Sequence, residues 1–369
     1  MNIFARSRSI RPGIVLGLAL ALAACGSSPT AGPQKNGDQS RGNTSAEAVY
    51  NKFNGLTGDG RLEQIVQAAE KEGELSLYTT LTSDGASTVK KAFEAKYKIK
   101  VSAYRASSET VLQRVQSEQQ AGHSGNDALE LNGFELTAMN REGYLAEFKG
   151  KAREAIPPSG QRPGWTADRL NLFVASRNTN LAPEAPATLE GFTDPKWRGK
   201  LSIEQGDVDW YLAVRDYYRG KGKSDSEVTD LFKKLVANSK VTSGHAPQIE
   251  GLSSGQFAVA LTTYSYMAQE LADKGAPITH KPFVEPVVQR PNGVAMMKTA
   301  AHPAAAYLFY QWMITDGQQV IKDLGLTSPL ATEDSKGMEG VEVVEVDLEK
   351  LLNENKQLND EYHNILTSK

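Results

Sequence analysis

Hydrophobic and polar positions follow two periods along most of the chain. Val89, Phe93 and Tyr97 recur at the spacing of one face of a helix. Short apolar runs lie between such segments, and the clearest, 257–262 (FAVALT), has the length of a buried strand. The pattern predicts strands at 75–78, 99–104, 127–131, 171–175, 199–203, 257–262 and 293–298. It predicts helices at 61–71, 84–97, 107–121, 210–219, 226–237, 264–274, 302–316 and 347–365, and one more that ends near 143.

Strands that alternate with helices in this way predict βαβ units. The expected fold class is therefore α/β, with a largely parallel sheet. The chain has 369 residues and shows no internal repeat. Such a length is large for one hydrophobic core and favours two lobes.

The first residues have the pattern of an export signal. Arg6, Arg8 and Arg11 precede an apolar run at 14–24, and no acidic residue stands among them. The run is about half of the roughly 20 residues that a helix needs to cross a bilayer. A basic start, a short apolar core and small residues predict a secretory signal peptide over 1–24 rather than a spanning anchor.

Cys25 is the only cysteine of the chain and follows this signal directly. The sequence Leu22-Ala23-Ala24-Cys25-Gly26 resembles the bacterial lipobox, whose cysteine is lipidated and becomes the mature N-terminus. The alternative is an ordinary signal peptide with a chance cysteine. An exported chain with one cysteine cannot form an internal disulfide, and acylation would consume the free thiol. We expect an exported protein, lipid-anchored to the outer face of the bacterial cytoplasmic membrane or in the periplasm.

A polar stretch separates this cysteine from the rest of the chain. Residues 26–45 include no Val, Ile, Leu or aromatic residue. Such a segment buries no apolar area, so a flexible tether is expected over 25–45, with the folded body beginning near Ala46. The net charge is −3, which gives no basic surface for nucleic acid. No later segment approaches transmembrane length.

Five stretches, taken in order, carry a resemblance to a known family. They are EGELSLYTTL (72–81), YRASSETVLQRVQSEQQAG (104–122), DPKWRGKLSI (194–203), GQFAVALTTYSY (255–266) and KTAAHPAAAYLFYQWMITDGQQV (298–320). Together they resemble the type 2 periplasmic binding proteins of ABC importers, and among these the ferric-iron-binding receptors. The resemblance implies two α/β lobes with a ligand cleft between them that closes on binding. It also implies that the chain crosses between the lobes more than once.

We place these crossings near Asn171 and Val287. The expected domains are 46–170 for the first part of lobe 1, 171–286 for lobe 2, 287–345 for the return to lobe 1, and 346–369 for a C-terminal helix. This helix is expected to pack back on the second lobe.

Candidate ligand-binding residues lie beyond the carboxyl ends of the predicted strands, where open α/β sheets bind ligands. In lobe 1 they are Thr80, Thr82, Arg105, Ser107, Ser108, Glu130 and Asn132. An arginine beside a serine-rich helix start is suited to a carboxylate or a phosphate. The alternative is a helix cap with a surface arginine.

In lobe 2 the candidates are Asp207, Trp210, Thr263, Tyr264 and Tyr266. The loop Gln205–Trp210 contains two aspartates at a helix start, which repel an anion. They favour a ligand that carries a positive charge or several hydroxyl groups, and the alternative is N-capping by aspartate. Trp210 offers a flat apolar wall, or else packs in the core.

The resemblance to ferric receptors implies a pair of adjacent tyrosines after strand 257–262. Tyr264 occupies the first position, Ser265 stands in the second, and Tyr266 comes one residue late. If a helix begins here, the two tyrosines point about 200° apart and cannot face one metal, whereas an extended turn would bring them together. The usual histidine after the first strand is absent, and Glu130 is the candidate carboxylate. Tyr264 and Glu130 are thus the metal ligands expected if the solute is ferric iron.

The sequence supports neither of two patterns that are typical of enzymes. Residues 251–255 (GLSSG) match G-x-S-x-G, but the expected strand follows the motif, whereas a nucleophile elbow requires a strand before it. The histidines show no metal-ligand spacing and are expected at the surface or as caps; they are His123, His245, His280, His302 and His363.

The sequence therefore predicts a monomeric receptor of an ABC importer that captures a small polar solute and delivers it to a membrane permease. A ferric-iron receptor of the same fold is the first alternative, with iron as transported ligand. No other cofactor and no catalysis are expected. The rival class is an exported hydrolase or transferase.

Overall fold

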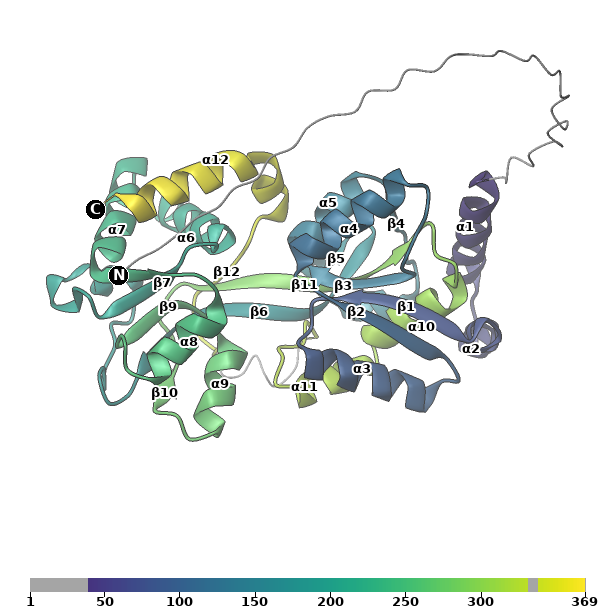
Figure 1. Ribbon diagram of the computed structural model, residues 1–369, viewed down its shortest axis with the longest axis horizontal. Coiled ribbons are helices and arrows are strands. Elements are labelled where there is room, and N and C mark those ends of the chain that lie inside the picture. The colour runs from purple at the N-terminus through teal and green to yellow at the C-terminus, as the bar shows by residue number, and fades with distance from the viewer. Residues whose placement is uncertain (1–38, 331–337, 369) are drawn as a thin grey trace, which may run out of the picture. The chain divides into compact units, whose positions relative to one another are not determined.

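Two lobes share one mixed β-sheet in the computed structural model (Figure 1). It describes residues 39–330 and 338–368, so the predicted signal peptide and Cys25 lie outside the described residues. The sheet and its covering helices confirm the predicted α/β class.

Lobe 1 is built from two parts of the chain, one before and one after the segment that forms lobe 2. Its strands are β1 (Glu74–Thr79), β2 (Lys100–Arg105), β3 (Ala128–Asn132), β4 (Leu145–Ala146) and β5 (Gln161–Arg162). Its α-helices are α1 (Gln39–Gly55), α2 (Arg61–Glu72), α3 (Ser83–Lys96), α4 (Ser108–Gln120), α5 (Gly133–Arg141), α10 (Pro303–Met313) and α11 (Gly317–Asp323). Short 3-10 helices lie at η1 (Lys151–Ala155) and η2 (Pro158–Gly160).

Lobe 2 is built from the middle of the chain. Its strands are β7 (Leu201–Glu204), β8 (Ser239–Thr242), β9 (Val259–Tyr264) and β10 (Ile278–Thr279). Its helices are α6 (Val208–Gly220), α7 (Asp225–Asn238), α8 (His245–Ser253) and α9 (Ser265–Asp273), with 3-10 helices η3 (Leu189–Thr193) and η4 (Pro195–Trp197).

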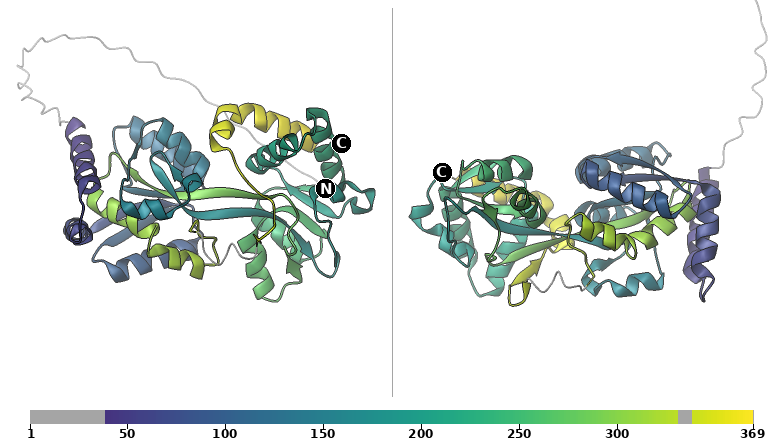
Figure 2. Two further views of the ribbon diagram at one scale, coloured as in Figure 1. Left: turned by 180° about the vertical axis from the view of Figure 1, so that it is seen from behind. Right: turned by 90° about the horizontal axis from the view of Figure 1, so that it is seen from below.

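Two long strands, β6 (Trp165–Asn178) and β11 (Val287–Met297), run through both lobes (Figures 1 and 2). The main strand order is β2-β1-β3-β11-β6-β9-β7-β8. As predicted, β1 pairs in parallel with β2 and β3, and β7 pairs in parallel with β8 and β9. The long strands β6 and β11 pair antiparallel with each other, with β9 and β3, and with the short strands β4, β5 and β10. Asn171 faces Arg290 in this central register.

Both strands are longer than the predicted segments 171–175 and 293–298 because polar residues interrupt the apolar pattern. Arg169, Asn171 and Asn292 are nonetheless buried in the sheet. Arg169 Nε lies 3.0 Å from a Glu130 oxygen, and its Nη1 donates to Asn171 Oδ1 at 3.0 Å. Such partners allow polar residues to stand in a buried strand.

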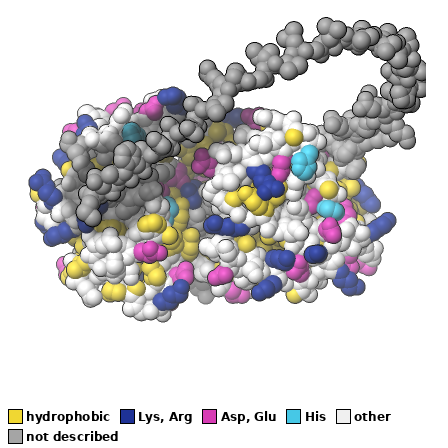
Figure 3. All heavy atoms as spheres, in the orientation of Figure 1, with side chains coloured by type: hydrophobic (Ala, Val, Ile, Leu, Met, Phe, Trp, Pro, Cys, Tyr) yellow, Lys and Arg dark blue, Asp and Glu magenta, His cyan; other side chains and the backbone are white. Residues whose placement is uncertain are grey.

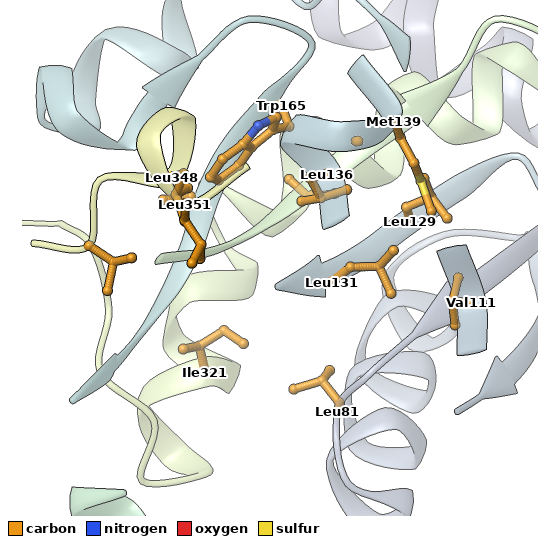
Figure 4. Packing of buried hydrophobic residues seen from close by; sticks show 14 of the residues in the cluster. Leu81, Val111, Leu129, Leu131, Leu136, Met139, Trp165, Ile321, Leu348 and Leu351 are labelled. Atoms are coloured by element: carbon orange, nitrogen blue, oxygen red, sulfur yellow. The ribbon is translucent and has the colours of Figure 1, made fainter. Parts of the chain in front are cut away.

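The C-terminal helix α12 (Leu348–Thr367) packs on α6 and α7 of lobe 2 and on α5 of lobe 1. Tyr362 donates a hydrogen bond to the Glu204 carbonyl at 2.7 Å and stacks on Tyr211. On the lobe 1 side, Arg141 pairs with Glu349, and Leu348 and Leu351 lie beside Trp165 (Figure 4). The sequence predicted packing on the second lobe; the helix in fact joins both.

Helix α1 begins at Gln39, so residues 39–45 are helical and do not belong to the flexible tether predicted to reach Ser45. The reason is tertiary packing farther along the helix: Phe53 meets Tyr307 edge-on at 5.2 Å, and Tyr50 donates to the Met297 carbonyl at 2.9 Å. A docked helix extends beyond its packed turns because propagation is cheaper than nucleation.

The remaining strand β12 (Val343–Glu345) pairs in parallel with the start of β11. Among the described residues, no helix is both long enough and apolar enough to span a bilayer. On the face drawn in Figure 3, acidic and basic side chains of the described residues are interspersed.

Candidate functional site

A cavity of about 440 Å³ lies between the lobes and is bounded by both of them. Lobe 2 supplies the turn between β7 and α6, the first residue of α8 and the end of β9. Lobe 1 supplies α4 and the start of α5, while β11 and α12 add further walls. The lining side chains that carry charge are Glu109, Glu135, Glu204, Asp207, Asp209, His245 and Arg290.

The lobe 2 wall is formed by Glu204, Asp207 and His245. His245 Nε2 lies 3.1 Å from Asp207 Oδ1. The two oxygens of Glu204 accept backbone hydrogen bonds from Gly206 at 2.6 Å and Gly244 at 2.8 Å, which fixes the carboxylate. Asp207 Oδ2 is buried and has no hydrogen-bond partner among the described residues.

Burial controls the charge of this wall. Burial raises the pKa of Asp207 above its ordinary value, although His245 opposes the shift. For His245, burial alone would lower the pKa, but the facing Asp207 and Glu204 raise it. The pair therefore retains a proton to a higher pH than either free side chain.

Arg290, on β11, also lines the cavity. Its Nη1 lies 2.7 Å from Asp209 Oδ2, and its Nη2 donates to the Tyr264 hydroxyl at 3.0 Å. The guanidinium lies 5.2 Å from the Phe173 ring centre and 5.5 Å from that of Tyr264. These contacts hold the cavity's arginine in place and neutralise Asp209.

The lobe 1 wall carries Asn132 and Glu135 at the start of α5. The Asn132 side-chain oxygen accepts from Asn292 Nδ2 at 2.7 Å. Glu135 is 9% exposed, and its Oε2 has no hydrogen-bond partner in the described part of the chain. Burial raises the pKa of this carboxyl to about 7.

The last wall comes from α12. Leu351, Asn355 and Asn359 line the cavity. They stand four residues apart, the spacing that places side chains on one face of a helix. Two side-chain amides thus belong to the α12 wall of the cavity.

The predicted site residues fall into three groups. Asn132, Asp207 and Tyr264 line the cavity described above. Thr80, Thr82, Arg105 and Tyr266 line a separate cavity of about 140 Å³, together with Arg169. The others do not line either cavity; they are Ser107, Ser108, Glu130, Trp210 and Thr263.

Each member of this last group has a structural partner. Ser107 caps α4 by accepting from the Thr110 amide at 3.2 Å, and Ser108 Oγ accepts from the Asn132 amide at 3.0 Å. Thr263 is fully buried and donates to the Val174 carbonyl at 2.9 Å. Trp210 is 1% exposed and packs edge-on against Phe232, which is the core alternative considered for it.

Glu130 is fully buried, and an arginine already neutralises its charge, so it does not suit a metal ion. One oxygen pairs with Arg169 at 3.0 Å, and the other accepts from the Thr79 hydroxyl at 2.6 Å. The strand pattern placed it correctly at the end of β3, but the arginine that neutralises it comes from β6, which the sequence does not place beside it.

Tyr264 and Tyr266 adopt the extended alternative. Tyr264 is the last residue of β9 with φ −82° and ψ 134°, and α9 begins only at Ser265. The two rings therefore stack 5.8 Å apart with an interplanar angle of 11°. Their neighbours differ, however, because Tyr264 lines the larger cavity and Tyr266 the smaller one.

Sequence reasoning missed most of the polar residues of the larger cavity; they include Glu109, Glu135, Glu204, His245, Arg290, Asn355 and Asn359. The prediction of His245 as a surface or capping residue is wrong, because it packs 4.1 Å from the Tyr264 ring and faces Asp207. The polar run at 289–292 (QRPN) interrupts an apolar strand, and this interruption is the sequence feature that could have marked Arg290 as a site residue.

Residues 88–335 match the model of a family described as bacterial extracellular solute-binding proteins. The chain belongs to this family. The G-x-S-x-G match at 251–255 lies at the end of α8, and β9 follows it. A nucleophile elbow has the opposite order, with the strand before the motif.

Known members and structures of this kind resemble the chain over most of its length. Iron uptake protein A1 of Synechocystis is 24% identical over 277 residues, which is 69% of this chain and 75% of that protein. The fructose-6-phosphate-bound periplasmic binding protein AfuA of Actinobacillus pleuropneumoniae superposes with a TM-score of 0.67 at 19% identity, covering 81% of this chain and all of that one. Iron-bound HitA of Pseudomonas aeruginosa superposes with a TM-score of 0.64 at 17% identity, covering 79% and 99%. The two-lobed fold predicted from the sequence is confirmed.

Proposed function

We propose that the chain is the receptor of an ABC importer and binds, in the cavity between its lobes, a small polar solute that donates hydrogen bonds. The solute carries a positive charge or several hydroxyl groups. Its binding closes the lobes around β6 and β11, and the closed form delivers it to a membrane permease. The chain acts by binding rather than by catalysis, as a monomer held at the membrane through lipidated Cys25.

One observation carries the proposal. Carboxylate oxygens of Glu135 in lobe 1 and Asp207 in lobe 2 are buried beside the same cavity and lack hydrogen-bond donors among the described residues. A buried polar atom without a partner is costly, so a ligand that supplies donors to both lobes would relieve the cost. Such a ligand also favours the closed arrangement of the two lobes.

A thermal-shift screen tests this function. Polyamines, polyols, sugar phosphates, phosphonates and ferric salts with and without phosphate would be added to purified protein. A ligand at a hundred times its Kd adds about 2.7 kcal/mol, which shifts the melting temperature by a few degrees. Glu135→Gln should weaken an organic solute at least tenfold, whereas Thr82→Ala, outside this cavity, should not. If no solute shifts the melt, the receptor function is wrong.

Ferric iron is the second candidate, favoured by the 24% identity to an iron uptake protein. Tyr264 would be its phenolate ligand, with the stacked Tyr266 close by. Ferric iron bound by tyrosine gives a visible charge-transfer band. Tyr264→Phe should abolish this band, and a band of unchanged intensity would contradict the assignment.

A further inference from the structure

Glu204, Asp207 and His245 form a compact group with metal-binding atoms. Each offers one such atom, and the three atoms lie within 4.8 Å of one another. They come from the end of β7, the turn before α6 and the first residue of α8. The 3.1 Å between His245 Nε2 and Asp207 Oδ1 is close to the separation of roughly 3.3 Å expected for two ligands bound to one ion at about 2.0–2.2 Å.

A second observation points to a missing partner in this group. Asp207 is 3% exposed, and its Oδ2 has no hydrogen-bond donor within the described chain. His245 Nδ1 also lacks a partner there. A hydrogen bond between His245 and Asp207 alone thus leaves a buried carboxylate oxygen unsatisfied, which costs free energy unless another group binds it.

The local charge favours a cation. Arg290 pairs with Asp209 at 2.7 Å, and His245 faces the two remaining carboxylates, those of Glu204 and Asp207. Two carboxylates and an imidazole bind a divalent ion with near balance of charge. Carboxylate oxygen with imidazole nitrogen suits first-row transition metals, whereas Ca²⁺ and Mg²⁺ prefer oxygen alone.

The three side chains are also held in place before any ion binds. Backbone amides of Gly206 and Gly244 fix both oxygens of Glu204. Phe173 and Tyr264 flank the His245 ring, at 6.0 and 4.1 Å. Preorganisation of this kind lowers the ordering cost of binding.

We propose that Glu204, Asp207 and His245 bind a divalent transition-metal ion, with open coordination positions toward the cavity. The inference deepens the proposed function and rests on it, because the positively charged solute is then a hydrated metal ion, whose bound water donates the hydrogen bonds. It uses neither Tyr264 nor Glu130, the ligands expected for ferric iron.

Calorimetric titration of the purified protein with ZnCl₂ tests the site. We expect one Zn²⁺ per chain and much weaker binding of MgCl₂ and CaCl₂. His245→Gln and Asp207→Asn should each weaken Zn²⁺ binding at least tenfold. Loss of an outer-shell partner alone lowers metal affinity by about tenfold or more, and these two residues are proposed as direct ligands. His363→Gln, which removes an exposed histidine that does not line the cavity, should bind Zn²⁺ within about threefold of the original chain.

Melting curves in EDTA show whether the variants fold. If either variant does not fold, Co²⁺ is added to the unaltered protein instead. Its visible spectrum should indicate a nitrogen ligand, and one equivalent of Zn²⁺ should displace the Co²⁺. Equal Zn²⁺ affinity in the folded variants, or no one-to-one binding, would overturn the metal site. If ZnCl₂ fails to bind while an organic solute binds in a Glu135-dependent manner, only the metal site is wrong; if neither binds, the receptor function fails too.

Discussion

Single residues in the cavity show how burial decides chemistry. Glu130 lies in β3 and Glu135 stands at the start of α5, yet Glu130 is neutralised by Arg169, whereas one oxygen of Glu135 has no hydrogen-bond partner in the described part of the chain. A sequence shows that carboxylates follow a strand, but their protonation depends on neighbours from distant elements. Burial raises the pKa of Glu135 to about 7, so this carboxyl is the one to test by titration.

Glu135→Gln should change how stability depends on pH. The pKa of Glu135 is about 7 in the folded chain and near 4.5 when exposed, so the folded state binds the extra proton in that interval. Stability is therefore fully present below about pH 4.5 and falls as the pH rises toward 7, by up to about 3 kcal/mol. Glutamine stays neutral, so urea unfolding should show the variant gaining on the original chain between pH 5 and pH 8. A constant difference across that range would contradict the assignment.

At the scale of elements, helix α12 contacts both lobes and forms one wall of the cavity, and we call this helix the strap. Its apolar residues Leu348 and Leu351 contact lobe 1 beside Trp165 (Figure 4), while Tyr362 is bonded to lobe 2. The amphipathic pattern predicted this helix within a few residues. It did not predict the second partner, because a helical period shows that a face is buried and not what covers it.

Tyr362→Phe tests the strap. The hydroxyl is buried and donates to the Glu204 carbonyl at 2.7 Å, so its removal leaves that carbonyl without the bond and should cost about 1–3 kcal/mol in urea unfolding. Tyr211→Phe is the matched control, because its hydroxyl lies 3.4 Å from Glu361 and its ring makes the same stack. Equal losses in the two variants would show that the buried bond adds nothing.

The whole molecule was predictable in class and in outline. Strands such as β1 and β3 and helices such as α3 and α6 were located to within about two residues, because each has one dominant period. The shared strands β6 and β11 were shortened, since Arg169, Asn171 and Asn292 break the apolar alternation where the chain passes between lobes. The residues of the cavity were predicted only in part, because its walls come from elements that lie far apart in the sequence.

Lobe closure gives a prediction at this scale. The lobes are joined by β6, β11 and α12, and a ligand that contacts Glu135 and Asp207 together is expected to favour their approach. Small-angle X-ray scattering should show a smaller radius of gyration when a solute that raises the melting temperature is added. An unchanged radius at saturation would mean that the solute binds one lobe alone.

The strap also sets the order in which the cavity can be assembled. Tyr362 contacts the carbonyl of Glu204 across 158 positions of sequence, and Asn355 and Asn359 lie in the same final helix. Contacts of such high sequence separation form slowly and late. During synthesis both lobes can therefore fold before the cavity has its last wall, so a nascent chain should gain its solute affinity only when its last helix has been made.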